Sequence, residues 1–245
     1  MRYHIFILLF VASSLIVKGQ DYIADYKKVS EKFRTANINA KITVFLYNKI
    51  DGTPEKVGTG YIKKLGNEFS KSKYNSVEQI KNRDKFLVID HESLEIDLYA
   101  YDQKVFDKVS TNKMLPDSIL TKYLQNFDYS YEKLSDGSKK YTFNLLKPSD
   151  ANNSTEGSFF YFSSIEVIIK NDFLITINYI YNPNLVKEIG GEKLSVKYNY
   201  LSETVRKNEF SLNSYVIKKG STYILTPMFK NYSLSIYSET YETIE

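Results

Sequence analysis

The sequence lacks cysteine altogether. This absence excludes disulfide bonds, thiolate metal sites and a lipid-modified N-terminal cysteine. A chain without such covalent links must be held together by its core. About 225 residues remain once an N-terminal leader is removed, and this length is enough to bury a core of the required size.

The sequence also lacks a large excess of positive or of negative charge. The chain has 33 Lys and Arg against 29 Asp and Glu, a formal net charge of +4, and the two signs are interspersed. A nucleic-acid-binding surface would need a concentrated basic stripe. The sequence therefore predicts no nucleic-acid partner.

Long apolar runs are confined to the N-terminus, which reads "MRYHIFILLFVASSLIVKGQ". Arg2 supplies the positive charge, residues 5–17 are mostly apolar, and Gly19 is a small residue before a cleavage point, as in a secretory signal peptide. The run is short for a membrane span of about 20 residues, which disfavours an uncleaved anchor. We expect a signal peptide over 1–19, cleaved after Gly19, and a single domain over 20–245. The mature protein is then exported, to the periplasm or, as the alternative, to the medium.

Aromatic residues are abundant, with 22 tyrosines and 15 phenylalanines, and such residues favour strands. The first mature segment is instead typical of an amphipathic helix. Its apolar stripe is Ile23, Tyr26, Val29 and Phe33, and the residues between them, Asp25 included, are predicted to face solvent. Six strand-like segments with short turns follow within about 60 residues, beginning with "AKITVFLYN", and predict an antiparallel meander.

A second amphipathic helix is predicted in mid-chain, in "LPDSILTKYLQNF". Its apolar stripe is Ile119, Leu120, Tyr123, Leu124 and Phe127. Further strands follow to the C-terminus. The simplest packing places both helices on one face of the sheet, and a sheet of this size tends to curl. The predicted fold class is therefore α+β: a large curved antiparallel sheet forms a half-open β-barrel, and the N-terminal and mid-chain amphipathic helices lie across its concave face.

His91 is the single histidine of the mature chain and lies among acidic residues in "FLVIDHESLEIDLYAYD". Leu94, Ile96 and Leu98 alternate with polar residues, which predicts a half-buried strand, and "DHES" reads as the turn before it. A metal site with imidazole ligands typically uses two or three of them. No serine stands in a G-x-S-x-G elbow. We therefore interpret His91 as a residue of a hairpin tip.

Other catalytic patterns are equally weak. The glycines of "GTG", Gly58 and Gly60, lack the third glycine of a dinucleotide fingerprint, because position 63 is Lys63. They are more typical of a strand with a bulge or tight curvature. No pair of carboxylates stands out, which leaves a hydrolase as a less favoured hypothesis. The sequence predicts no catalytic residue, no cofactor and no metal.

The order of these segments resembles the periplasmic lipoprotein-carrier superfamily, which comprises LolA-like proteins and the related LolB and RseB domains. The resemblance covers most of residues 21–245. It rests on the leader, the helix "YIADYKKVSEKFRTAN", the strand "AKITVFLYN", the pair "VGTGYIKKLGNEFSKSKYN", the segment "VEQIKNRDKFLVIDHESLEIDLYAYD", the mid-chain helix and the later strands. The best-known carriers hold their lid with an arginine on an early strand. The mature arginines here, Arg34, Arg83 and Arg206, match no such position.

The resemblance implies a non-catalytic, monomeric carrier for acylated lipoproteins or other apolar lipid ligands, with a transient membrane-associated partner. The candidate cavity residues are apolar positions on the helices and the first strand: Tyr26, Phe33, Ile42, Val44, Leu120, Tyr123 and Leu124. An ordinary core residue would show the same apolar pattern at each of these positions. The alternative hypothesis is an envelope interaction or assembly module with a packed interior, which offers strand edges to a partner.

Overall fold

The computed structural model describes residues 22–83, 85–100, 127–146 and 161–237. The chain forms two compact units. Among the described residues, the first contains 22–33, 44–57, 127–146 and 161–197, and the second contains 34–43, 58–83, 85–100 and 198–237. Three strands contribute residues to both units: β1 (Ile38–Tyr47), β2 (Pro54–Leu65) and β11 (Lys193–Tyr200).

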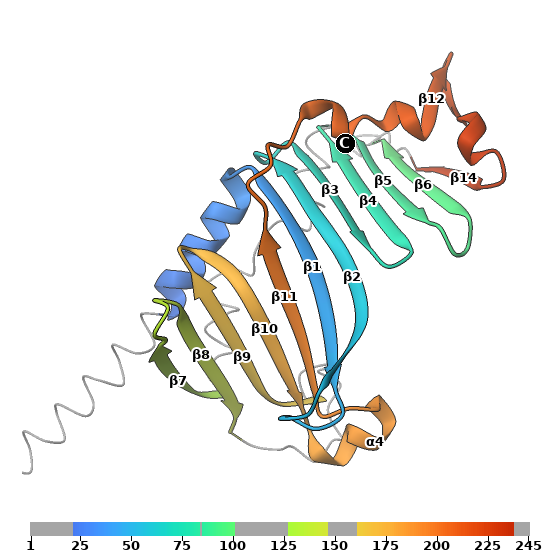
Figure 1. Cartoon of the computed structure of the whole chain (residues 1–245). Helices are drawn as coiled ribbons and strands as arrows, with labels where there is room; N and C mark the ends of the chain where they lie inside the picture. Colours follow the sequence, from blue (N-terminus) through green and yellow to red (C-terminus); the bar gives the residue numbers. More distant parts are fainter. Residues whose placement is uncertain (1–21, 84, 101–126, 147–160, 238–245) are drawn as a thin grey trace, which may run out of the picture. The chain divides into compact units, whose positions relative to one another are not determined.

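The sheet of the first unit has the strand order β2-β1-β11-β10-β9-β8-β7. Its own strands are β7 (Phe127–Lys133), β8 (Lys139–Leu145), β9 (Phe162–Lys170) and β10 (Phe173–Tyr181), joined as antiparallel neighbours. A two-residue turn of Asn171 and Asp172, both at positive φ, joins β9 to β10. The backbone twist of such a turn matches the right-handed twist of the flanking strands, which is why hairpins favour it. Strands β8 to β11 are seen side by side in Figure 1.

The N-terminal helix spans residues 22–35. Tyr22, Tyr26 and Val29 pack in one hydrophobic cluster with side chains of β7, β8 and β9. The ring of Tyr22 meets Phe143 edge-on at 4.6 Å between centroids, a geometry that aromatic pairs prefer. Tyr26 and Val29 of the predicted stripe, together with Tyr22, therefore place the helix on the sheet, whereas Ile23 and Phe33 are half-buried and do not belong to this cluster.

The sheet of the second unit has the order β14-β6-β5-β4-β3-β2-β1-β11. Its own strands are β3 (Phe69–Tyr74), β4 (Val77–Asn82), β5 (Lys85–Asp90), β6 (Glu95–Ala100) and β14 (Ser233–Tyr237). Strand β14 pairs with β6 in parallel, whereas β3 to β6 are antiparallel. Strands β14 and β7 each have one hydrogen-bonded neighbour, so the sheet of the described residues is not closed.

A C-terminal segment, residues 201–232, covers one face of β3 to β6 in the second unit. It contains η3 (Lys207–Phe210), η4 (Leu212–Ser214), β12 (Val216–Lys219), β13 (Thr222–Leu225) and η5 (Pro227–Phe229). The core beneath it is the inward side of β4, β5 and β6. That core comprises Ile80, Leu87, Ile89, Ile96 and Leu98 from the sheet, and Leu212, Tyr215, Val216 and Phe229 from the segment.

The expected strand series agrees with the structure, with local corrections. Strands β1 to β6 occupy the region of the predicted meander, but the single strand expected in "VEQIKNRDKFLVID" is two strands, β4 and β5. Leu94 was expected within the next strand. It lies in the turn before β6, at a φ of 59° and 42 % exposed. The all-antiparallel expectation is wrong for β14, because this last strand runs parallel to β6.

The expectation of two amphipathic helices does not match the helices of the described residues. These are the N-terminal helix and α4 (Val186–Ile189), a four-residue helix with no buried residue. The predicted mid-chain helix lies outside the described residues, except that Phe127 from its stripe is the first residue of β7. The predicted signal peptide also lies outside them.

The glycines of "GTG" are in a strand, as expected, and Gly60 permits a close approach of β3. Gly60 pairs with Tyr74, and a Cβ at Gly60 would collide with the backbone carbonyl oxygen of Lys73. A Cβ at Gly58 would meet only the end of the Tyr74 side chain, with its oxygen at 2.5 Å. The end of a side chain can move, whereas the backbone of a paired strand cannot move without breaking the hydrogen bonds to its neighbour.

We expect Gly60→Ala to lower the free energy of unfolding by about 1–3 kcal/mol, the range for overpacking. Gly58→Ala should have a smaller effect, because the Tyr74 side chain can rotate away. Urea denaturation of both variants checks the order. Equal losses would contradict a backbone constraint specific to Gly60.

Candidate functional site

One face of the first unit carries its apolar side chains in continuous rows. Strand register places residues of β7 to β11 directly opposite one another, so that a row crosses all five strands. Two adjacent rows are wholly apolar or aromatic. They are Tyr131–Tyr141–Val167–Ile177–Val196 and Tyr129–Phe143–Ile165–Tyr179–Leu194. We call these ten residues the apolar face.

The opposite side of the same strands is polar. Its rows are Ser130–Thr142–Glu166–Asn178–Ser195 and Glu132–Lys140–Ile168–Thr176–Lys197. Glu166 is bound there by Lys140 at 2.7 Å and by the amide of Asn178 at 2.8 Å. Side chains alternate across a strand with a period of two, so this contrast follows directly from the alternation in the sequence.

The N-terminal helix lies over one part of the apolar face. The cluster that contains Tyr22 and Tyr26 includes members of both rows from β7, β8 and β9. Tyr141 and Phe143 are buried in it. The members from β10 and β11 are half-buried instead: Ile177, Tyr179, Leu194 and Val196. Apolar surface therefore continues along the rows beyond the cluster that includes the helix.

Asp25 attaches the helix to strand β8. Its side chain accepts hydrogen bonds of 2.6 Å from Lys139 Nζ and 2.6 Å from the Tyr141 hydroxyl, and the residue is 5 % exposed. Burial raises the pKa of the Asp25 carboxyl, but the Lys139 and Tyr141 hydrogen bonds outweigh it, so the pKa lies below its ordinary value. The expectation that Asp25 faces solvent is wrong, because a helix pattern cannot show a partner that lies far along the chain.

The predicted cavity residues are distributed over both units. Tyr26 and Val44 are in the first unit, where Tyr26 packs with the helix cluster and Val44 is buried. Phe33 is half-buried in the first unit, and Ile42 is half-buried in the second. The remaining three, Leu120, Tyr123 and Leu124, lie outside the described residues. The rows of β8 to β11 were not among the predicted cavity residues, although the alternation in "FLITINYIY" and "KLSVKYNYL" contains part of their pattern.

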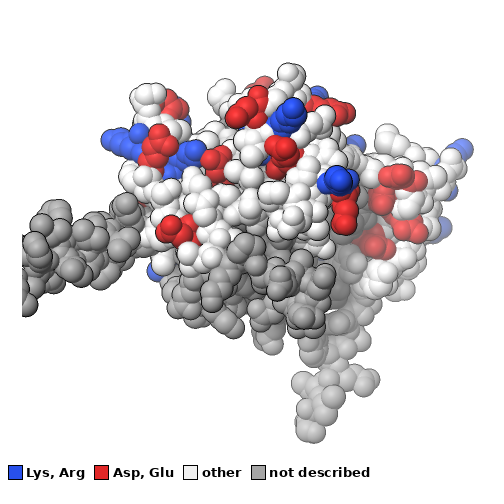
Figure 2. Space-filling view, turned by 90° about the horizontal axis from the view of Figure 1, so that it is seen from below, with Lys and Arg blue, Asp and Glu red and all other residues white. Residues whose placement is uncertain are grey.

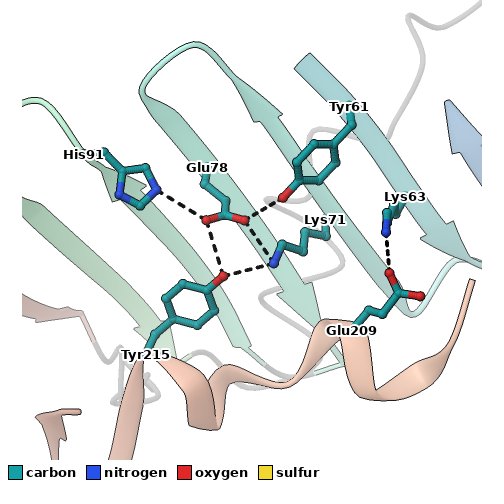
Figure 3. Close-up of polar contacts among 7 residues, drawn as sticks. All are labelled: Tyr61, Lys63, Lys71, Glu78, His91, Glu209 and Tyr215. Carbon is teal, nitrogen blue, oxygen red and sulfur yellow. Dashed lines mark hydrogen bonds and ion pairs between the residues drawn. The ribbon is translucent and has the colours of Figure 1, made fainter. Parts of the chain in front are cut away.

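A second cluster, polar rather than apolar, surrounds Glu78 on β4 (Figure 3). The buried carboxylate accepts a hydrogen bond of 2.7 Å from the Tyr61 hydroxyl and lies 3.0 Å from Lys71 Nζ. It also receives the Tyr215 hydroxyl at 3.3 Å and lies 3.4 Å from His91 Nε2. Figure 3 shows these side chains converging from the sheet and from the C-terminal segment, which supplies Tyr215.

The charges of this cluster stabilise one another. Burial raises the pKa of Glu78, but hydrogen bonds from Tyr61, Lys71 and His91 outweigh it and leave the pKa below its ordinary value. Burial lowers the pKa of Lys71, whereas its hydrogen bonds to Tyr215 and Glu78 raise it above the ordinary value. The pair is therefore held as carboxylate and ammonium. Nearby, Lys63 pairs with Glu209 of η3 and joins the same segment to the sheet.

His91 follows β5 in a turn, as predicted for a hairpin tip, but its ring has partners inside the unit. The Nδ1 atom lies 3.0 Å from the Tyr232 hydroxyl, and Nε2 faces Glu78. The cluster thus joins the sheet to both Tyr215 and Tyr232 of the C-terminal segment. Its contacts attach one element to another, which is a structural role. Among the described positions there is no group of three or more His, Cys, Asp or Glu that could hold a metal ion.

The surface charges are mixed. Figure 2 shows Lys and Arg interspersed with Asp and Glu on the face seen there, with no area of basic residues alone. Among the arginines of the described residues, Arg83 pairs with Glu68 at 3.0 Å, and Arg206 precedes η3. Within the described ranges, no helix has both the length and the apolar character that a membrane span requires.

Comparison with known proteins gives structural likeness only. No family model matches the chain, and no curated protein matches it. An uncharacterized conserved protein from Thermus thermophilus is similar over 89 % of this chain and 99 % of its own, with 11 % identity and a TM-score of 0.43. MucB is similar over 84 % of this chain and 65 % of its own, with 6 % identity and a TM-score of 0.40. A LolA superfamily protein from Nitrosomonas europaea is similar over 77 % of this chain and 96 % of its own, with 10 % identity and a TM-score of 0.30. These names include the superfamily that the sequence resembles.

The Glu78 cluster predicts an acid-sensitive contribution to stability. Because the folded-state pKa of Glu78 is lowered, the contribution is complete above the unfolded pKa of about 4.3 and is lost as pH falls through the folded pKa. At pH 7, Glu78→Gln should lower the free energy of unfolding by about 1–3 kcal/mol, because Lys71 loses its buried partner. The gap between variant and parent should narrow below about pH 4.

Urea denaturation at several pH values between 3 and 7 measures this gap. Glu132→Gln is the matched control, because Glu132 is exposed on β7. A gap for Glu78→Gln that stays constant from pH 7 to pH 3 would contradict the ionised state of the buried carboxylate.

Proposed function

We propose that the protein is an exported, non-catalytic binding protein or carrier for an acylated lipoprotein or another apolar lipid ligand. The observation that supports this most directly is the apolar face of the first unit. Its two rows cross β7 to β11 without a polar interruption, and the members on β10 and β11 are half-buried.

The dimensions and chemistry of the apolar face suit an acyl chain. Neighbouring strands lie about 4.8 Å apart. The half-buried row members on β10 and β11 provide two adjacent strands of apolar surface for part of an acyl chain, whereas Tyr141 and Phe143 on β8 are buried with the helix. Burial of each methylene contributes about 0.8 kcal/mol, so a chain that lies along one row could bind without any polar contact. The tyrosines Tyr131 and Tyr179 add hydroxyl groups that can meet the polar end of such a ligand.

The leader at residues 1–19 supports export, and the periplasm is the proposed location, with secretion as the alternative. A non-catalytic role is supported by the arrangement of the reactive groups. The side chains of Lys71, Glu78 and His91 bind one another, Tyr215 and Tyr232, so each of these groups has partners within the protein.

A second candidate is an interaction module that binds an extended segment of a partner at a strand edge. The observation that favours it is the open sheet, in which β14 and β7 are terminal strands. Such edges accept added strands through main-chain hydrogen bonds. This candidate needs no ligand on the apolar face.

Substitutions on opposite faces of one sheet can test the carrier proposal. Ile177 is on the apolar face and Ile168 is on the polar side of the neighbouring strand, and both are half-buried. We expect Ile177→Ser to weaken the binding of a fluorescent fatty acid about three- to tenfold, because apolar contact area is lost. Ile168→Ser should leave the affinity unchanged. Titration of the mature protein with the probe gives both affinities.

Native mass spectrometry of the mature protein, exported in bacteria and purified without detergent, provides an independent measurement. A mass adduct that organic solvent releases is the expected result. A bare mass, together with no probe binding, would refute the carrier proposal and favour the interaction module. Equal effects of the two serine variants would place the probe away from the apolar face.

A further inference from the structure

The second unit carries a β-hairpin that is separate from its main sheet. Strands β12 and β13 pair only with each other, through a two-residue turn of Gly220 and Ser221. Gly220 has a φ of 63°, which the first position of such a turn requires. In Figure 1 the hairpin stands out from the C-terminal segment of its unit.

The base of this hairpin is firmly attached. Val216 is buried in the core of the unit, and Tyr223 and Leu225 pack against that core. Thr226 donates its backbone N–H to the Tyr215 carbonyl at 2.9 Å and its hydroxyl to the Ser214 carbonyl at 3.0 Å. An isolated two-stranded hairpin is only marginally stable in water. These contacts therefore give the hairpin a defined position.

The outward side of the hairpin carries apolar side chains that do not pack in the core of the unit. Ile217 and Ile224 are directly opposite each other and are 45 % and 42 % exposed. Met228 follows in η5 and is 82 % exposed, although its neighbour Phe229 is buried. These three side chains add little to the core. Their exposure has an unfavourable free energy in water, which another surface could relieve.

The net positive charge of this segment indicates the kind of surface that its apolar side chains would contact. Residues 210–238 contain three lysines, Lys218, Lys219 and Lys230, and no Asp or Glu. The rest of the chain has both signs interspersed. Lys219 is on the same side of the hairpin as Ile217 and Ile224, whereas Lys218 pairs with Tyr223 on the side that packs against the core. Lysines beside exposed apolar side chains are typical of segments that lie at the interface of an anionic membrane.

We infer that the β12–β13 hairpin and Met228 dock onto an anionic lipid membrane, with Ile217, Ile224 and Met228 in the headgroup region and Lys219 and Lys230 beside lipid phosphates. Two isoleucines and one methionine are too few to anchor a protein permanently. The contact is reversible and depends on salt, because the electrostatic attraction extends only about one Debye length. The inference rests on the second unit alone and is independent of the ligand proposed for the first.

Sedimentation with phosphatidylcholine vesicles that contain 25 % phosphatidylglycerol measures the contact for the mature protein. Binding is expected in about 0.1 M salt and should decrease strongly in about 0.5 M salt. Lys219→Gln/Lys230→Gln should reduce the partition coefficient about tenfold or more, because each lysine near an anionic surface contributes about fivefold. Lys49→Gln, in an exposed turn of the first unit, is the control and should have little effect.

Insertion of the apolar side chains can be detected directly, because the protein contains no tryptophan. Met228→Trp introduces a single reporter, and we expect its emission to shift to the blue with anionic vesicles. Ile50→Trp is the matched control, since Ile50 is 40 % exposed in the first unit, and its emission should not shift. Circular dichroism confirms that each variant is folded.

Absence of wild-type binding to anionic vesicles at low salt would overturn the inference, as would equal shifts of the two reporters. A Met228→Trp shift that depends on protein concentration without vesicles would assign the hairpin to contacts between copies of the chain, which also overturns it. Fatty-acid binding by the lysine double variant should remain at the wild-type level. A failure of membrane docking is therefore distinguishable from a failure of the carrier proposal.

Discussion

A buried carboxylate that binds a lysine and at least one tyrosine is the interaction on which each unit depends. In the first unit Asp25 attaches the N-terminal helix to β8 through Lys139 and Tyr141. In the second, Glu78 attaches the C-terminal segment to the sheet through Lys71 and Tyr215. A cysteine-free chain has no covalent means of holding a covering element on a sheet. Instead of a covalent link, a buried carboxylate that is hydrogen-bonded by fixed donors holds the covering element in one position. Removing the donors would leave an uncompensated buried charge, which is costly in free energy.

The two clusters have a common composition, which explains the high tyrosine content in part. A tyrosine places its ring in apolar surroundings and its hydroxyl on a carboxylate, so it can belong to the core and to the polar cluster at once. Tyr141 does this beneath the helix, where its ring packs with Tyr22 while its hydroxyl binds Asp25. Tyr215 does the same from within the C-terminal segment, where its ring packs with Phe229 while its hydroxyl binds Glu78.

Local patterns in the sequence were enough for the elements that have a strict period. Alternation located the strands of the meander. The three- to four-residue spacing of Tyr26 and Val29 located the helix. Pairings over long separations were not accessible in this way. The parallel partner of β14, the burial of Asp25 and the contact of His91 with Glu78 each depend on residues from a distant part of the chain. The apolar face could be predicted in part. The alternation of apolar residues is visible within each strand, but the rows across strands can be seen only once the register between the strands is known.

Strands β1, β2 and β11 contribute residues to both units, and this sharing bears on how the protein unfolds. A domain joined by a linker can melt alone, since its loss leaves the neighbour's hydrogen bonds intact. Here the backbone passes from one unit to the other within a regular strand and not through a linker, so local opening of a shared strand in one unit reaches backbone that belongs to the other.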